Sequence, residues 1–212
     1  TVMQVKLIQH LDEISASAWN ALEGGIDNPF LRHEFLAGLE QHGCVGEHWG
    51  WSPHHLALYD GARLIGAVPM YLKYNSYGEL VFDWAWADAY QRAGLRYYPK
   101  MVVAVPYSPV TGPRLLIAED ADREQVANTL ISQALELTRE MNVSSLHWLF
   151  PHQDDMRRLE QQGLMRRTGT QFHWHNRDYR TFDDFLSTFS AQKRKKLKRE
   201  RRRVTDQGIQ IE

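Results

Sequence analysis

One long amphipathic helix, predicted for residues 122–141, constrains the fold of this chain more than any other feature. Asp122 begins it, and Gln125 follows three residues later, as in a capping box. The apolar residues after it recur at helical spacing and form one stripe: Val126, Leu130, Ile131, Ala134, Leu137 and Met141. Short apolar runs at 114–117 and 144–150 flank this helix and are typical of buried strands. Two strands joined through such a helix predict an α/β domain.

The rest of the chain alternates between strand and helix patterns. The strongest turn signal is Asp60-Gly61, which predicts a hairpin between two apolar runs. The further elements are a strand at 3–8, a helix capped by Asp12 or Ser15 that ends at Gly24-Gly25, a helix at 30–43, hairpin strands at 56–60 and 63–72, a strand at 102–105, a helix at 154–162 and a strand at 171–176. This order predicts a mixed sheet flanked by helices and resembles the acyl-CoA N-acyltransferase (GNAT) arrangement.

Composition excludes several classes of protein. The chain has no run of 18 apolar residues and no signal-peptide pattern, so we expect no membrane span and a cytoplasmic location. Cys44 is the single cysteine, which rules out an internal disulfide and argues against a thiolate metal cluster. Residues 208–212 read as the opening of a strand with nothing after it, so we expect a fragment of a longer protein.

The stretch 74–114 is rich in Trp, Tyr and Pro, and we interpret it as a substrate-site insertion between two strands. It contains the carboxylates of Asp83 and Asp88. If residues 82–86 are extended, Asp83 faces opposite the aromatic rings, which would raise its pKa and suit it as a base toward an attacking amine. The alternative is that each carboxylate caps a turn or pairs with Arg92 or Arg96.

Other side chains of this insertion could bind a substrate. Lys100 and Arg114, like Lys73, lie at its borders and could hold phosphates, although a solvated surface role is the alternative. Hydrogen bonds from tyrosine and serine hydroxyl groups could orient a sugar or peptide, while indole rings build the wall; dense aromatic residues are often simply core. The predicted substrate-binding residues are Tyr74, Trp84, Trp86, Lys100, Tyr107, Ser108 and Arg114.

Thr181 is predicted to cap a turn of helix, and Ser190 is predicted to cap a strongly basic helix at 190–206, which has nine Lys or Arg among residues 193–203. Few apolar side chains remain there to pack, so most of its surface must face solvent or a polyanion. The candidate polyanion-binding residues are Lys193, Arg194, Lys195, Lys198 and Arg201. A solvated helix that packs only against a missing part of the protein is an equally good interpretation.

Histidines give a weaker signal. His173 and His175 would point the same way on a strand and could meet His147, and three imidazoles suffice for zinc. No acidic or Cys ligand accompanies them at a recognisable spacing. We therefore predict no metal site.

Several motifs together resemble the FemAB-like group of predicted N-acyltransferases, a family labelled peptidoglycan biosynthesis/recognition. They are NPFLRHEFL (28–36), VPMYLKYNSYGE (68–79), VFDWAWADAY (81–90), YYPK (97–100), VPYSPVTGPR (105–114) and QFHWHN (171–176). The resemblance implies two GNAT-like halves, of which residues 1–180 would be the first and 181–212 the start of the second. It also implies acyl or aminoacyl transfer to an amine. Fem relatives use aminoacyl-tRNA as donor and a peptidoglycan precursor as acceptor. We predict no cofactor for this chain.

One loop departs from the ordinary GNAT pattern. Those enzymes hold the CoA pyrophosphate on a glycine-rich loop at a helix N-terminus. The corresponding segment here, residues 118–122, has three carboxylates and no glycine. We therefore expect no conventional CoA site in this half.

The favoured function is N-acyl or aminoacyl transfer. The alternative is a non-catalytic module in which the insertion recognises a glycan or peptide and the basic helix recruits a polyanion. An enzyme needs a titratable group close to the reacting amine, whereas a binding module needs only the aromatic wall.

Overall fold

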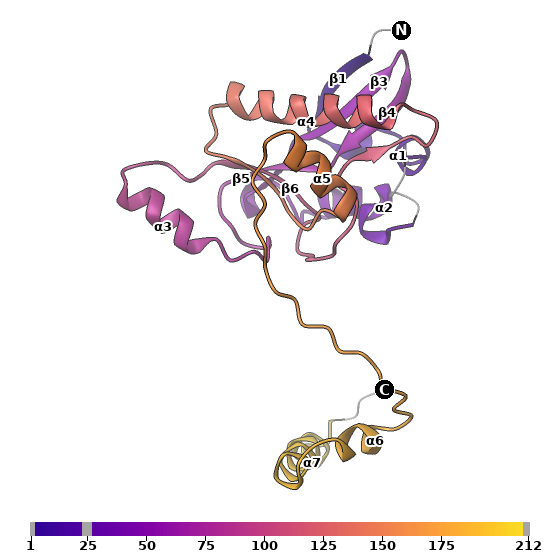
Figure 1. Cartoon of the computed structure of the whole chain (residues 1–212), viewed down its shortest axis with the longest axis vertical. Helices are drawn as coiled ribbons and strands as arrows, with labels where there is room; N and C mark the ends of the chain where they lie inside the picture. Colours follow the sequence, from indigo (N-terminus) through magenta and orange to yellow (C-terminus); the bar gives the residue numbers. More distant parts are fainter. Residues whose placement is uncertain (1–2, 23–26, 210–212) are drawn as a thin grey trace. The chain divides into compact units, whose positions relative to one another are not determined.

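The computed structural model describes residues 3–22 and 27–209 (Figure 1). The chain divides into two compact units, Thr1–Thr168 and Gly169–Glu212. Among the described residues, no helix is long and apolar enough to span a bilayer. The predicted division into two GNAT-like halves at residue 180 stays a prediction.

Eight strands of the first unit form two four-stranded sheets, ordered β1-β3-β4-β7 and β2-β5-β6-β8. All neighbours are antiparallel except β6 and β8, which are parallel. The strands are β1 (Met3–Ile8), β2 (Trp51–Pro53), β3 (His55–Asp60), β4 (Arg63–Val68), β5 (Met70–Lys73), β6 (Lys100–Val103), β7 (Leu116–Ile117) and β8 (Leu146–Trp148).

Helices surround these sheets in the first unit, and two further helices make up the second. The helices are α1 (Ala16–Asn20), α2 (His33–Gln41), α3 (Trp84–Arg92), α4 (Arg123–Glu140), α5 (Gln153–Gln161), α6 (Phe182–Ser187) and α7 (Ala191–Asp206), with 3-10 turns at Leu11–Glu13, Pro29–Leu31 and Glu47–Trp49. The prediction of an α/β fold with helices flanking mixed sheets is confirmed. The expected end of the first helix at Gly24-Gly25 lies outside the described residues.

The hairpin predicted at Asp60-Gly61 is confirmed and is longer than expected, because it runs through both sheets. Gly61 has a φ of +59°, which suits a glycine in this tight turn. The predicted strand 63–72 is divided at Pro69, whose missing N–H interrupts the ladder. The side chain of His55 fills part of the gap, because its Nδ1 accepts a hydrogen bond of 3.1 Å from the Met70 N–H. The two sheets therefore share one bent hairpin.

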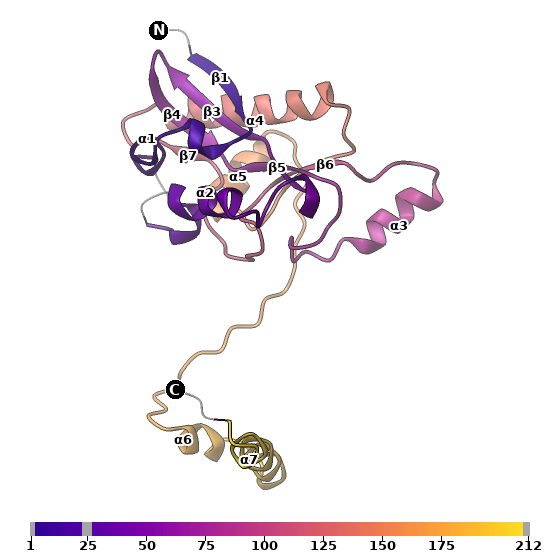
Figure 2. The ribbon, with the colours of Figure 1, turned by 180° about the vertical axis from the view of Figure 1, so that it is seen from behind.

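The core lies on both faces of β3 and β4. Leu58 and Ile65 pack in one cluster with Val126 and Leu130 of α4, while neighbouring residues of the same strands pack with α1 and α2 on the opposite face. Gly66 allows α4 to approach closely, since a Cβ there would lie 2.7 Å from Val126 Cγ1. Figures 1 and 2 show α4 along one face of these strands and α1 and α2 on the other. This pattern confirms the long amphipathic helix, which Asp122 caps by accepting a hydrogen bond from the Gln125 N–H.

The local structure differs from the sequence interpretation at two segments. Residues 82–86 are not extended, because α3 begins at Trp84 with Asp83 as its N-cap residue, and alanine at 85, 87 and 89 favours helix. Residues 171–176 form no strand, although their side chains alternate. No neighbouring strand pairs with this segment among the described residues, and an unpaired strand leaves its backbone groups unsatisfied. The insertion thus carries a helix of its own.

Candidate functional site

Two buried lysines lie at the base of the insertion, opposite each other across β5 and β6. Lys73 is the last residue of β5, Lys100 is the first of β6, and the antiparallel register pairs them directly. Both side chains are fully buried. Two like charges at opposed positions destabilise a sheet unless other groups neutralise them. The insertion supplies those groups as the carboxylates of Glu79 and Asp83, which are also buried.

Lys100 is the centre of this arrangement, which we term the lysine cluster: Lys73, Ser76, Glu79, Asp83, Tyr97 and Lys100. The Lys100 Nζ donates to Glu79 Oε2 at 2.8 Å, to Asp83 Oδ2 at 2.6 Å and to Ser76 Oγ at 3.1 Å. An ammonium group has three donors, and these contacts use all of them. The Tyr97 hydroxyl also donates to Asp83 Oδ2.

Asp83 is held as an anion. Burial alone would raise its pKa, but hydrogen bonds from Lys100, Ser76 and Tyr97 outweigh it and lower the pKa to about 2. The expectation that aromatic neighbours raise the pKa of Asp83 is therefore wrong. The physical reason is that Asp83 turns inward onto Lys100 at the start of α3, while Trp84 and Trp86 turn outward. A carboxylate with so low a pKa is a weak base.

Burial shifts the pKa values of Glu79 and Lys73 in opposite directions. Burial raises the pKa of Glu79 even though Lys100 opposes the shift. Burial lowers the pKa of Lys73 to about 7, against the attraction of Glu79. Lys73 Nζ donates to the Tyr77 carbonyl at 3.0 Å and lies 3.7 Å from the centre of the Trp51 ring. Among the described residues, Glu79 Oε1 and Asp83 Oδ1 are buried without a hydrogen-bond partner.

His147 lies beside the lysine cluster, with its ring 6.3 Å from that of Tyr97. Its Nε2 is 2.7 Å from Ser145 Oγ, and burial lowers its pKa to about 4, so the ring is neutral at pH 7. His173 and His175 stack with ring centres 6.3 Å apart in the second unit. Within the described ranges, no group of three or more His, Cys, Asp or Glu side chains could hold a metal ion.

The structure brings Asp83 and Lys100 together but places the other predicted residues of the insertion apart from them. Asp88 is exposed on α3 and pairs with Arg92 at 2.9 Å, which is the alternative considered for it. Tyr107 donates its hydroxyl proton to the Cys44 carbonyl at 2.7 Å. Ser108 is half-buried beside it. Tyr74, Trp84 and Trp86 are exposed, and their predicted binding roles stay predictions.

Arg114 is buried in a different setting. Its guanidinium group donates to the carbonyl oxygens of Leu149, Val110 and Pro113 at 2.9, 2.7 and 3.1 Å. Asp155 lies nearby and accepts from the backbone N–H groups of Arg114 and Leu115 at 2.6 and 3.1 Å. Burial lowers the pKa of Arg114 to about 10, so it stays charged at pH 7. The predicted phosphate-binding role of Arg114 stays a prediction.

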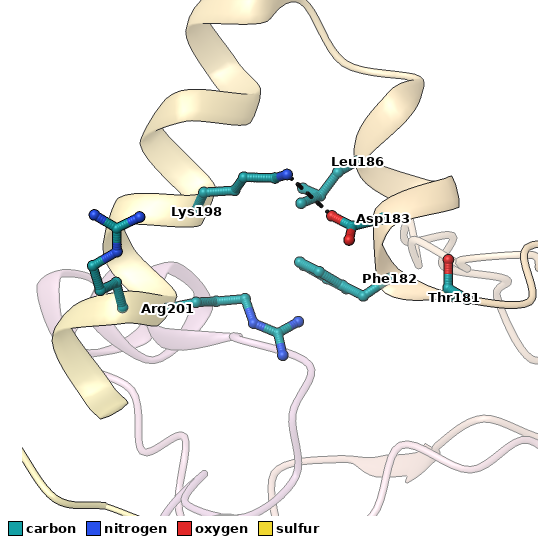
Figure 3. A pocket seen from close by; sticks show the side chains of 7 residues that line it. Thr181, Phe182, Asp183, Leu186, Lys198 and Arg201 are labelled. Carbon is teal, nitrogen blue, oxygen red and sulfur yellow. Dashed lines mark ion pairs between the residues drawn. The ribbon is translucent and has the colours of Figure 1, made fainter. Parts of the chain in front are cut away.

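The second unit carries the basic helix α7, which Ser190 caps as expected. A shallow pocket of about 400 Å³ opens between α6 and α7 (Figure 3). The Arg201 guanidinium lies 3.9 Å from the centre of the Phe182 ring, and Lys198 pairs with Asp183 at 3.1 Å. Lys193 lies 5.3 Å from the Phe189 ring. Three of the five predicted polyanion-binding side chains thus have partners on or beside α6. The other two are Arg194 and Lys195, and the polyanion-binding role of all five stays a prediction.

Sequence reasoning missed Glu79, Ser76 and Tyr97 as parts of the site. One signal could have found Glu79. Residues at the two ends of an insertion between antiparallel strands are cross-strand neighbours, so Lys73 and Lys100 required two acids close by. Glu79 is the acid nearest in sequence to Lys73.

A family model described as FemAB-like, peptidoglycan biosynthesis/recognition, matches residues 10–212 of the chain. A comparison with curated protein sequences gives no match.

Solved structures similar to this chain include three acetyltransferases. The ribosomal-protein-alanine N-acetyltransferase from Brucella melitensis biovar Abortus 2308 is 16% identical, with a TM-score of 0.49 and coverage of 82% of this chain and 99% of the other. A GNAT family acetyltransferase from Staphylococcus aureus is 10% identical, with a TM-score of 0.47 and coverage of 82% and 100%. The aminoglycoside antibiotic 6'-N-acetyltransferase AAC(6')-Ih from Acinetobacter baumannii is 10% identical, with a TM-score of 0.45 and coverage of 84% and 99%.

Proposed function

This chain belongs to the FemAB-like family of peptidoglycan biosynthesis/recognition, and we propose that it transfers an acyl or aminoacyl group to the amine of a peptidoglycan precursor or a similar acceptor. The match of the family model over residues 10–212 is the observation that carries this proposal. The lysine cluster supports it, because the pKa values of Lys73 and Glu79 are shifted by burial. Side chains with shifted pKa values cluster at sites where protons are transferred.

In the proposed reaction the acceptor nitrogen attacks the carbonyl carbon of an activated ester. A C–N bond forms, the C–O bond to the donor breaks, and the nitrogen loses a proton as the leaving oxygen gains one. Holding the two reactants together supplies much of the rate. A base with a pKa near neutrality assists by accepting the nitrogen's proton.

Within the lysine cluster, Glu79 and Lys73 suit the role of proton acceptor better than Asp83. The pKa of Glu79 is raised and its Oε1 is unpartnered among the described residues, whereas the pKa of Asp83 is lowered to about 2. We assign Asp83 and Lys100 to positioning, since the Lys100 ammonium joins both carboxylates. All four side chains are buried, so direct contact with the acceptor requires the loop 74–83 to shift.

The acyl donor is proposed to be other than CoA bound in the usual way. Within the loop 118–122, Asp120 forms an exposed ion pair with Arg63, and Asp122 caps α4. A pyrophosphate at this helix end would meet carboxylates rather than free N–H groups. An aminoacyl-tRNA donor fits the charge of α7, whose cations could bind its phosphates.

The test offers the chain acetyl-CoA or a set of charged tRNAs, together with a muramyl-pentapeptide precursor, and measures the acceptor by mass spectrometry. A mass gain of one amino acid that falls sharply in Glu79→Gln supports aminoacyl transfer. Asp88→Asn is the matched control, because that carboxylate is exposed and outside the lysine cluster. If no donor yields a gain while the precursor still binds, the chain is a recognition module and the proposal fails.

A further inference from the structure

The loop before α3 buries its charged side chains and exposes its apolar ones, which is the opposite of an ordinary surface loop. The carboxylates of Glu79 and Asp83 are buried on Lys100, whereas the side chains of Leu80 and Phe82 between them are exposed, Phe82 by 72%. A loop normally directs charges to water and apolar groups to the core. Here the ionic contacts hold the loop and leave its apolar side outward.

The backbone of this loop is strained at the two apolar positions. Leu80 has a φ of 62° and Phe82 a φ of 52°, values in the left-handed region that large side chains rarely adopt. Such conformations persist only where the surroundings impose them, and they gather at functional sites. The bonds from Lys100 to the flanking acids are the restraint here, and their effect is to present Leu80 and Phe82 to the outside.

Further exposed apolar side chains, Trp84 and Trp86, lie on α3, which has no buried residue. The Tyr77 ring, exposed by 68%, packs against that of Trp84 with ring centres 5.1 Å apart. In Figures 1 and 2, α3 lies at the periphery of the first unit, away from the sheets. We term these exposed side chains the aromatic ridge: Tyr77, Leu80, Phe82, Trp84, Trp86 and Leu95. Single exposed apolar side chains are common, but such a concentration marks a binding surface.

Within residues 74–100 and at Arg167, the exposed charge that is left after ion pairing is positive. Asp88 and Arg92 neutralise each other, and the two other acids are buried on Lys100. Arg96 is exposed after α3. Arg167 donates to the Val81 carbonyl at 3.3 Å, which brings a second guanidinium group to the loop.

We propose that the aromatic ridge binds the surface of an anionic phospholipid bilayer. Trp, Tyr and Phe rings beside arginines are the side chains that partition into the headgroup region of a bilayer, and anionic lipids attract the cations. The side chains of the aromatic ridge would insert into the headgroup region, and the protein would stay on one side of the bilayer. A glycan-binding surface would surround its rings with hydrogen-bonding polar groups, whereas the polar side chains of this loop point inward.

The first test is flotation of the chain with vesicles of phosphatidylcholine and phosphatidylglycerol at physiological salt. The double variant Phe82→Ser/Trp86→Ser should bind about tenfold or more weakly, since it removes two large rings from the interface. Phe172→Ser is the control, because that ring is 97% exposed and lies outside the aromatic ridge. Equal binding of wild type and double variant would overturn the proposal.

The basic helix α7 could also attract anionic vesicles, so a second variant separates the two. Glutamine in place of Lys195, Arg199 and Arg202 removes exposed cations without touching the aromatic ridge. Salt screens this attraction but leaves apolar insertion in place. We expect the α7 variant to keep most of its binding at physiological salt. Binding that disappears in the α7 variant and survives in the ridge variant would contradict the proposal.

A third measurement tests how deeply Trp84 and Trp86 insert into the bilayer. Lipids brominated in the acyl chain near the headgroup should quench the tryptophan fluorescence of the bound chain. Trp84→Phe/Trp86→Phe keeps two aromatic rings and should still float, with most of that quenching lost. Unchanged quenching would place other tryptophans at the membrane and overturn the assignment. A change of oligomeric state in the Phe82→Ser/Trp86→Ser variant without any vesicle binding would also overturn it, in favour of a protein partner.

Discussion

Among the described residues of the first unit, two groups of buried charge can be compared, and they are built differently. Arg114 and Asp155 bond mainly to backbone carbonyl and N–H groups, so each charge joins segments of chain. In the lysine cluster, Lys100 bonds only to side chains that the insertion supplies, and two carboxylate oxygens have no partner among the described residues. A charge satisfied by backbone is expected to stabilise the fold. A group of coupled side chains with shifted pKa values is expected to serve function.

The largest effect should come from Arg114→Met. Loss of the guanidinium group leaves three carbonyl oxygens without their donor, one of them in a buried contact and two in half-buried contacts, and such unsatisfied groups are costly. We expect the free energy of unfolding to fall by about 3–5 kcal/mol, as measured by urea denaturation. If Arg114→Met costs less stability than Lys100→Met, the view that the charge bonded to backbone contributes more to the fold is contradicted.

Lys100→Met should cost less, about 2–4 kcal/mol at pH 7. Glu79 and Asp83 lose their counterion, but Glu79 protonates readily because its pKa is already raised. The stability deficit of Lys100→Met should therefore shrink as the pH falls below 7. Adding Glu79→Gln and Asp83→Asn to Lys100→Met should restore much of the stability, because no buried carboxylate remains in the lysine cluster. A deficit that is independent of pH would argue that Lys100 acts through packing alone.

The free energy of unfolding at acid pH should depend on the ionisation of Asp83. Its pKa is about 2 when folded and near 4 in an unfolded chain, so the unfolded state binds more protons between these values. The stabilisation is fully present above pH 4 and is lost as the pH falls through 2, a change of about 2 kcal/mol. The difference in unfolding free energy between wild type and Asp83→Asn should narrow over that window. A constant difference would show that Asp83 is not held as an anion.

The smallest effect is expected for Asp88→Asn. Asp88 pairs only with Arg92 on an exposed helix face, and such pairs contribute about 0.5 kcal/mol or less. Thermal unfolding should hardly change. A loss comparable to that of Asp83→Asn would mean that α3 is packed more tightly than its exposure indicates.

The sequence was sufficient for elements defined by local pattern. The stripe from Val126 to Ala134 buries one face against the sheet, and the caps at Ser15, Asp122, Thr181 and Ser190 are all present. These features depend on residues a few positions apart. The bend at Pro69 was harder to predict, because it depends on which strand each half of the hairpin meets.

The lysine cluster could be predicted only in part. Asp83 and Lys100 stood out by type, but the direction of the Asp83 pKa shift depends on a contact across 17 positions of the chain. Glu79 gave no local signal, because its importance comes from the pairing of Lys73 with Lys100. The site is formed by the pairing of two strands that are far apart in the sequence, and local composition does not show which residues pair.

The central claim is that the chain transfers an acyl or aminoacyl group with a proton acceptor in the lysine cluster. The most direct test compares the initial rate of transfer to a muramyl-pentapeptide precursor by wild type, Glu79→Gln and Asp88→Asn at matched folded fraction. We expect Glu79→Gln to lose about 100-fold or more, as removal of a general base does, and Asp88→Asn to keep its rate. Equal rates for all three would contradict the account and remove the lysine cluster from the chemistry.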